Sequence, residues 1–130
     1  MPYYTAIVSL LAIALYFFFA TRVAVAHRKF DVRLPAMAGN PGFERIYRIQ
    51  MNTLEWMPTF LVPLWICAFF LSDTVAALLG LVWVVGRALY YAGYAKAVEK
   101  RRPGFFIQST ACALLFIGAI AGIVLHASAG

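Results

Sequence analysis

Four long apolar stretches constrain this chain more than any other feature. They cover approximately residues 3–21, 43–71, 74–95 and 104–126, and each is long enough to cross a bilayer as a helix. Hydrophobic residues make up 64% of the 130 positions and charged residues 12%, which is too apolar for an ordinary soluble domain. Within a bilayer, a helix satisfies its backbone polar groups internally. The sequence therefore predicts an all-α, multi-pass integral membrane four-helix bundle, forming a single domain over residues 1–130.

The basic residues predict the orientation of this bundle. They gather in two connections, at about residues 22–45 and 96–102, which must lie on the same side of the membrane because two spans separate them. By the positive-inside rule this side is cytoplasmic, in a bacterial inner membrane or an endoplasmic reticulum. The net charge of +6 thus follows membrane topology, and we predict no nucleic-acid partner.

Neither the cysteines nor the histidines are spaced like metal ligands. Cys67 and Cys112 are single residues in apolar runs, and His27 and His126 fall at opposite ends of the predicted topology. A zinc site needs about four such ligands close together. We therefore predict no metal and interpret the cysteines as packing residues.

The second apolar stretch begins with polar residues on one helical face. Arg48, Asn52 and Glu55 stand at i, i+4 and i+7, positions that share a face of an α-helix. A charge near the middle of a span costs roughly 2.5 to 3.5 kcal/mol, so such residues normally face a bundle interior or a wet cavity. This set of donors and acceptors suits a zwitterionic ligand. The alternative is a structural ion pair at the membrane surface, the simpler account for Glu44, Arg45 and Arg48.

A second polar stripe follows in the third stretch. Arg87, Tyr90 and Tyr94 recur at helical spacing. Continuing the same helix places Arg101 on their face and turns Arg102 away from it. Because the spans alternate in direction, this stripe reaches the cytoplasmic side beside the start of the second stretch, and the two stripes together predict a polar site. For Arg101 the alternative is an anchor for lipid phosphate within a basic run.

Two motifs resemble those of a known family. They are FERIYRIQMNTLEWMP at residues 43–58 and GLVWVVGRALYYAGYAKAVEKRRPGF at residues 80–105, and both are similar to the MAPEG superfamily of eicosanoid and glutathione metabolism. The similarity covers about residues 20–125 and is greatest to the microsomal glutathione S-transferase and leukotriene C synthase branch. Two separated motifs in the expected order are far more specific than one short motif. The resemblance implies a homotrimer of four-helix subunits, with glutathione bound between adjacent subunits near the cytoplasmic face.

The resemblance also implies roles for individual residues. Arg101 falls at the position of the family's catalytic arginine, and Arg28 at that of a loop arginine in the active site. The positions that match glutathione-binding residues are Arg48, Gln50, Asn52, Glu55, Arg87, Tyr90 and Tyr94. His27 and Asp31 depart from the pattern of leukotriene C synthase, which favours a general transferase or peroxidase over leukotriene synthesis.

The activity implied by the resemblance is that of a membrane-bound glutathione transferase. A free thiol has a pKa of roughly 8.5, and a fixed guanidinium such as that of Arg101 favours its nucleophilic thiolate. The implied partners are glutathione as a substrate, a lipophilic electrophile or lipid hydroperoxide from the bilayer, and membrane lipids. Two alternatives stay open. One is a non-catalytic lipid-binding scaffold of the same superfamily, which a basic residue at position 101 disfavours, and the other is a small transporter, which usually has internal repeats.

Overall fold

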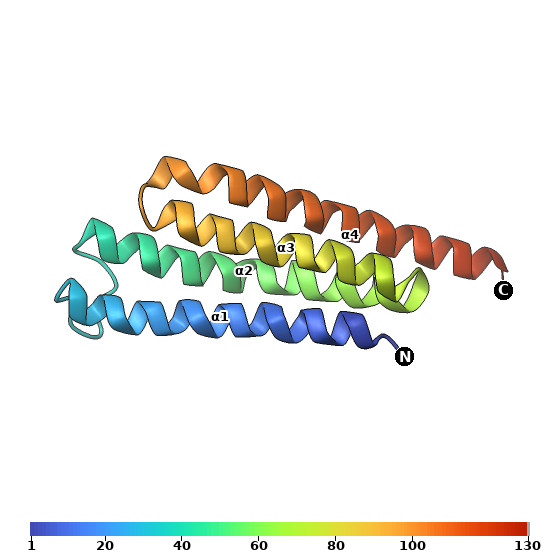
Figure 1. Ribbon diagram of the computed structural model, residues 1–130, viewed down its shortest axis with the longest axis horizontal. Helices are drawn as coiled ribbons and strands as arrows, with labels where there is room; N and C mark the ends of the chain where they lie inside the picture. The colour runs from blue at the N-terminus through green and yellow to red at the C-terminus, as the bar shows by residue number, and fades with distance from the viewer. Residues whose placement is uncertain (130) are drawn as a thin grey trace.

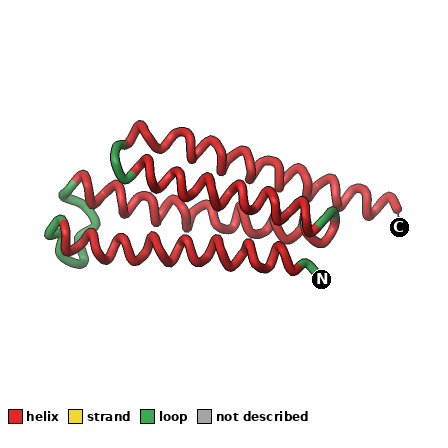
Figure 2. Tube along the Cα trace, viewed as in Figure 1, coloured by secondary structure: helices red, strands yellow, loops and turns green. Residues whose placement is uncertain are grey.

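Four long helices run antiparallel to one another in a computed structural model that describes residues 1–129 (Figure 1). The helices are α1 (Tyr3–Lys29), α2 (Pro41–Phe70), α3 (Asp73–Tyr94) and α4 (Arg102–Ala129), with a short 3₁₀ helix, η1 (Val98–Arg101), before α4. Every regular element in the described part of the chain is helical (Figure 2). The predicted all-α four-helix fold is confirmed, and all four helices are long and apolar enough to cross a membrane.

Two helices, α1 and α4, extend well beyond the predicted spans. α1 continues past residue 21 to Lys29, and its last turn carries basic residues. α4 extends the predicted span 104–126 by two residues at its start and three at its end. α2 passes through Pro58 and Pro63 as one helix. Hydropathy marks only the part of a helix that lies in hydrocarbon, whereas backbone hydrogen bonding can continue beyond that part. The apolar stretches therefore underestimate the length of these helices.

The turn between α2 and α3 joins three helices. Ser72 caps α3, because its hydroxyl oxygen accepts a hydrogen bond from the backbone N–H of Val75 at 3.2 Å. The Asp73 carboxylate reaches across to α1, where it accepts hydrogen bonds from the backbone N–H groups of Tyr4 and Thr5 at 3.1 and 2.9 Å. These two donors belong to the first turn of α1, which has no intrahelical partner for them. Asp73 therefore fixes the start of α1 to the start of α3.

Aromatic stacking and glycine set the spacing of the central helices. Phe60 of α2 and Trp83 of α3 are fully buried and stack with their ring centroids 3.9 Å apart. Gly86 of α3 lies so close to α4 that a Cβ added to it would be 2.7 Å from a backbone nitrogen of that helix. Gly104 of α4 packs in the same way against the backbone of α3 at Tyr90. Small residues permit this close approach of helices, which brings the end of α3 against the start of α4.

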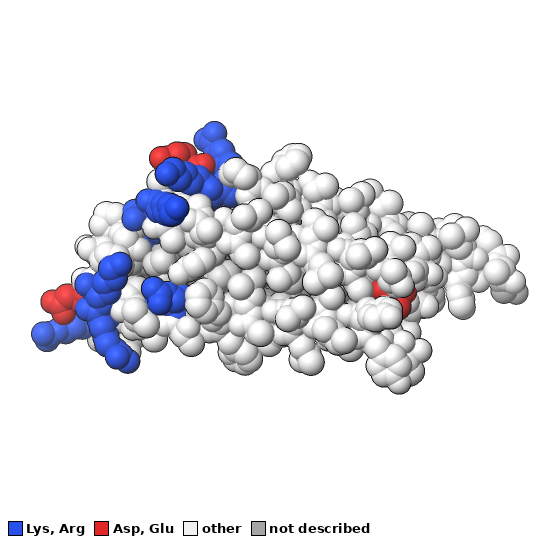
Figure 3. All heavy atoms as spheres, viewed as in Figure 1, with Lys and Arg blue, Asp and Glu red and all other residues white. Residues whose placement is uncertain are grey.

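The Lys and Arg side chains gather at one end of the bundle (Figure 3). The α1–α2 connection and η1 both lie at this end, and the chain termini lie at the other (Figure 1). The two basic connections therefore share one side of the molecule, in agreement with the predicted antiparallel topology. That this side is cytoplasmic stays a prediction of the positive-inside rule.

Candidate functional site

A cleft opens between α2, α3 and α4 at the basic end of the bundle. Its volume is about 570 Å³, within the usual range for a small-molecule site. The residues that line it are Arg48, Asn52, Tyr90, Tyr94, Arg101, Arg102, Phe105, Phe106 and Ser109. Five of the residues predicted for the site thus surround one cavity, which combines three guanidinium groups with an aromatic wall.

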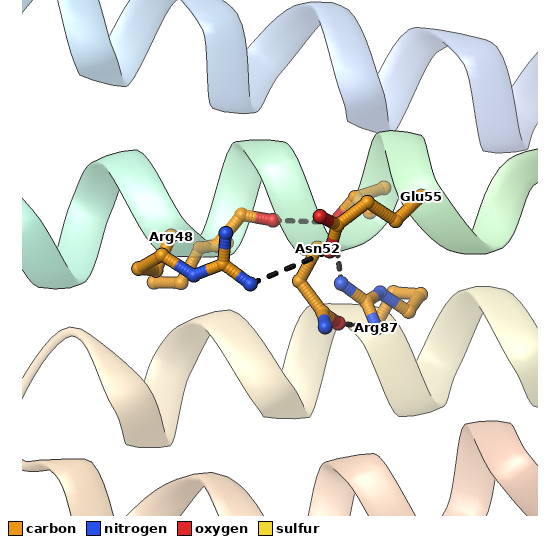
Figure 4. Close-up of polar contacts among 6 residues, drawn as sticks. Arg48, Asn52, Glu55 and Arg87 are labelled. Atoms are coloured by element: carbon orange, nitrogen blue, oxygen red, sulfur yellow. Dashed lines mark hydrogen bonds and ion pairs between the residues drawn. The ribbon is translucent and has the colours of Figure 1, made fainter.

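One wall of the cleft is the polar face of α2 (Figure 4). Arg48 Nη2 donates a hydrogen bond to Glu55 Oε1 at 3.3 Å, and the two side chains form an ion pair along the helix. The side chains are 48% and 56% exposed, so solvent screens the pair and it contributes little to stability. A structural ion pair was the alternative account of this face, but its exposure leaves both groups available to a ligand. Glu55 itself does not line the cleft.

Arg87 lies behind this wall in a fully buried position. Its Nη1 donates to Asn52 Oδ1 at 2.9 Å and its Nη2 donates to Thr53 Oγ1 at 2.6 Å (Figure 4). Its guanidinium carbon also lies 4.4 Å from the ring centroid of Tyr90, a cation–π distance. In this structure Arg87 therefore positions the Asn52 amide and the Tyr90 ring, and its contact with glutathione stays a prediction of the resemblance. Because Asn52 accepts through Oδ1, its Nδ2 is the group left to donate to a ligand.

The opposite wall combines two tyrosines with Arg101. The rings of Tyr90 and Tyr94 pack edge to face with centroids 5.3 Å apart. The guanidinium carbon of Arg101 lies 5.8 Å from the ring centroid of Tyr94, and its Nη1 donates to the carbonyl oxygen of Val98 at 2.7 Å. The side chain is thus held between η1 and the tyrosines, and a permanent positive charge faces the cleft.

The chain reaches Arg101 by a different route from the predicted one. α3 ends at Tyr94, and Ala97 is extended, with φ −162° and ψ 149°, before η1 begins. The chain turns back there, so no continuous helix runs from Tyr94 to Arg101. The prediction that Arg102 turns away from the tyrosine face is therefore wrong, because Arg102 lines the same cleft.

Four residues of the predicted site do not line the cleft: Glu55 and Arg87, described above, together with Arg28 and Gln50. Arg28 is exposed in the last turn of α1. Gln50 is half-buried on α2 and points away from Arg48, because two residues along a helix rotate a side chain by about 200°. Neither residue lines the cleft. The fold of one chain therefore does not bring all the predicted residues around one cavity.

The sequence-based prediction missed the α4 wall and the partner of Arg87. Phe105, Phe106 and Ser109 come from the first turns of α4, where an apolar run indicates only a membrane span. Thr53 is fully buried, but a threonine inside a span gives no signal of its own. Its position one residue after Asn52 could have placed it toward the third helix. Among residues 1–129, no group of three or more metal-ligating side chains is placed to hold a metal ion.

Comparison with known proteins identifies the family. The model of the MAPEG family matches residues 5–121. The chain belongs to the MAPEG family. This membership confirms the resemblance, and together with the four apolar helices it makes the chain an integral membrane protein.

Individual MAPEG relatives match along most of their length. Human microsomal glutathione S-transferase 2 is 39% identical over 118 residues, which cover 91% of this chain and 80% of the relative. Leukotriene C4 synthase of Bos taurus is 39% identical over 119 residues, which cover 92% of this chain and 79% of the relative. An uncharacterised protein of Synechocystis is 43% identical over 119 residues, which cover 92% of this chain and 87% of the relative.

The buried hydrogen bonds of Arg87 generate a prediction about stability. Thr53→Val removes one acceptor of this guanidinium and leaves a buried charged group incompletely satisfied, so it should lower the free energy of unfolding by about 1 to 3 kcal/mol. Detergent-solubilised protein unfolded with dodecyl sulfate and followed by circular dichroism measures this value. Thr59→Val is the matched control, because Thr59 is exposed on the same helix and its replacement should change stability by less than about 0.5 kcal/mol. Equal stability of the two variants would contradict the role given to Thr53.

Proposed function

We propose that this protein is a membrane-bound glutathione transferase that activates glutathione as a thiolate and conjugates it to lipophilic electrophiles. The observation that carries the proposal is that Arg101 and Arg48 line one cleft together with Tyr94. The relatives named as glutathione transferase and leukotriene C4 synthase support it. Glutathione is the substrate in this proposal, and no metal takes part.

Arg101 is the catalytic residue of the proposed mechanism. At neutral pH only a few per cent of a free thiol with a pKa of roughly 8.5 is the nucleophilic thiolate. A guanidinium fixed beside the sulfur in a partly dry cleft favours the charged form, and each pKa unit corresponds to about 1.4 kcal/mol. The thiol proton leaves to solvent. The sulfur then forms a bond to the electrophilic carbon while the leaving group departs with its electron pair.

The other charged groups of the cleft suit the remainder of the tripeptide. Glutathione carries two carboxylates and one ammonium group, and guanidinium groups bind carboxylates in two-pronged geometry. Arg48 and Arg102 are the candidates for the carboxylates, and Glu55 is the candidate for the ammonium group. Asn52 would donate from Nδ2 to a peptide carbonyl. Binding of glutathione would then replace the exposed Arg48–Glu55 ion pair by contacts to the ligand.

The second substrate would reach the sulfur through the bilayer. Phe105 and Phe106 form an apolar border of the cleft, and Phe106 is 72% exposed on a membrane-spanning helix. A lipophilic electrophile dissolved in the hydrocarbon could enter along this border without crossing water. The same thiolate would attack a lipid hydroperoxide that arrived by that route: an S–O bond forms as the O–O bond breaks, and the lipid alkoxide takes up a proton and leaves as the alcohol. The glutathione sulfenic acid that remains would react with a second glutathione to give the disulfide and water. We place the cleft on the cytoplasmic side, where glutathione is available, in accord with the positive-inside rule.

We further propose that the protein is a homotrimer with sites between subunits. Arg28 and Gln50 lie outside the cleft of their own subunit, although the resemblance implies that they contact glutathione. Copies of these residues from a neighbouring subunit would complete the site. A closed ring of identical subunits also shields the polar α2 face from lipid, which an isolated four-helix subunit leaves partly exposed.

The catalytic role of Arg101 predicts a change in a titration. Arg101→Ala should raise the pKa of the bound glutathione thiol by roughly one to two pKa units, because the charge that stabilises the thiolate is lost. Turnover of 1-chloro-2,4-dinitrobenzene near neutral pH should then fall about ten- to a hundredfold, with a smaller change in glutathione affinity. Ultraviolet difference spectroscopy follows the thiolate directly.

Lys100→Ala is the control for this experiment. Lys100 is an exposed cation in the same basic run and does not line the cleft, whereas Arg102 does. If Arg101 only anchors lipid phosphate, the thiolate titration should be the same in wild type and Arg101→Ala. An unchanged titration in Arg101→Ala, or equal losses of turnover in the two variants, would reject the assignment.

The shared site predicts complementation between two inactive variants. Arg28→Ala and Arg101→Ala should each have low activity alone, but mixed oligomers form some sites in which both arginines are intact. If one site takes Arg101 from one subunit and Arg28 from the next, random mixing in equal amounts restores about a quarter of the sites. Activity of co-expressed, co-purified protein, together with its mass in detergent, measures this. Full activity of a monomer, or no complementation in a confirmed oligomer, would contradict the proposal.

A further inference from the structure

A second, smaller hollow lies between α1, α2 and the end of α3. Its volume is about 150 Å³, and it shares no lining residue with the cleft described above. It is too small for a tripeptide but large enough for a phosphate group. The basic side chains that line it are Arg22, Lys29 and Arg45, and they come from two helices.

The cations of this hollow lack anionic partners within the described part of the chain. None of the lining residues is an aspartate or glutamate, and neither ion pair of the structure includes Arg22, Lys29 or Arg45. The Nε atoms of Arg22 and Arg45 are buried and have no hydrogen-bond partner in residues 1–129. Buried N–H groups in folded proteins nearly always have an acceptor. Three cations without an ion-pair partner around one hollow suit an anion with several oxygen atoms.

The position of the hollow indicates where this anion comes from. Arg22 directly follows a stretch of 21 residues without a charge, so it lies at the boundary between hydrocarbon and headgroups. Val25 and Ile46 add an apolar part to the lining. A phospholipid presents this combination of an anionic phosphate and an apolar chain at the membrane boundary. Inorganic phosphate has no apolar group that could contact Val25 and Ile46.

Two further features favour an anion at this place. Gly42 lies in the first turn of α2, so the positive end of that helix faces the hollow. The ring of Phe30 packs against Gly42, where an added Cβ would lie only 2.6 Å from the nearest ring atom. Lys29 Nζ lies 5.3 Å from the centroid of the same ring. The ring thus closes the hollow beside the helix end and holds the flexible lysine near it.

We propose that this hollow is a binding site for the headgroup phosphate of an anionic phospholipid. The phosphate oxygens would accept hydrogen bonds from Arg22 and Arg45, with Lys29 at the entrance. Three cations favour a lipid with a net negative charge over a zwitterionic one. A bound headgroup would link α1, α2 and α3 at the same end of the bundle as the candidate active site.

Competition between lipids with identical chains tests this proposal. The full-length protein in neutral detergent is exposed to equal amounts of dioleoyl phosphatidylglycerol and dioleoyl phosphatidylcholine, and native mass spectrometry counts the lipids retained on the folded oligomer. The acyl chains contribute equally, so the difference reports the headgroup. We expect phosphatidylglycerol to be retained preferentially, and Arg22→Gln and Arg45→Gln each to weaken its retention about tenfold. Lys29→Gln should weaken it less, because Lys29 is exposed at the entrance.

The control is Lys96→Gln, which removes one exposed cation from the same end of the bundle but not from the hollow. It should retain phosphatidylglycerol like the wild type. Equal losses in Lys96→Gln and Arg45→Gln would indicate general charge attraction and overturn the proposal. So would equal retention of the two lipids by the wild type. Displacement of phosphatidylglycerol by millimolar inorganic phosphate would overturn the assignment to a lipid. Because Lys29→Gln changes only an exposed side chain, it keeps the test decisive if an arginine variant fails to fold.

Discussion

The candidate site depends on the two hydrogen bonds that Arg87 donates from α3 to Asn52 and Thr53 of α2. A buried guanidinium within a membrane span is stable only if acceptors lie within reach of its fixed planar fork. Arg87 can reach both acceptors only in one register of α2 against α3. The Phe60–Trp83 stack holds the same two helices together. The two bonds that the guanidinium donates through Nη1 and Nη2 therefore also fix the orientation of the amide that faces the cleft.

The third side of the cleft depends on the glycine contacts between α3 and α4. Gly86 and Gly104 let the two backbones approach until no space for a Cβ is left. The connection between them, residues 95–101, turns back at Ala97 and places η1 beside the tyrosine end of α3. Arg101 reaches Tyr94 because of this reversal. The close packing of α3 against α4 and the position of Arg101 thus belong to the same turn of the chain.

The helices and the α2 face could be predicted from sequence because both depend on local periodicity. Arg48 and Glu55 do lie along one face, and they contact each other. The position of Arg102 could not be predicted from the same rule, because the extended backbone at Ala97 ends the helical period. The burial of Arg87 depends on a partner helix, which periodicity within α3 does not describe. In the proposed homotrimer, Arg28 and Gln50 would reach the ligand of a neighbouring subunit, and the sequence pattern of one chain carries no information about that contact.

In the proposed function, the cleft binds glutathione as a thiolate. Titration calorimetry of glutathione into the wild-type protein, near neutral pH and in two buffers of different ionisation enthalpy, counts the protons released on binding. Because free glutathione is almost entirely the thiol at this pH, binding as a thiolate should release close to one proton per site. Release of no protons, with glutathione bound, would contradict the claim.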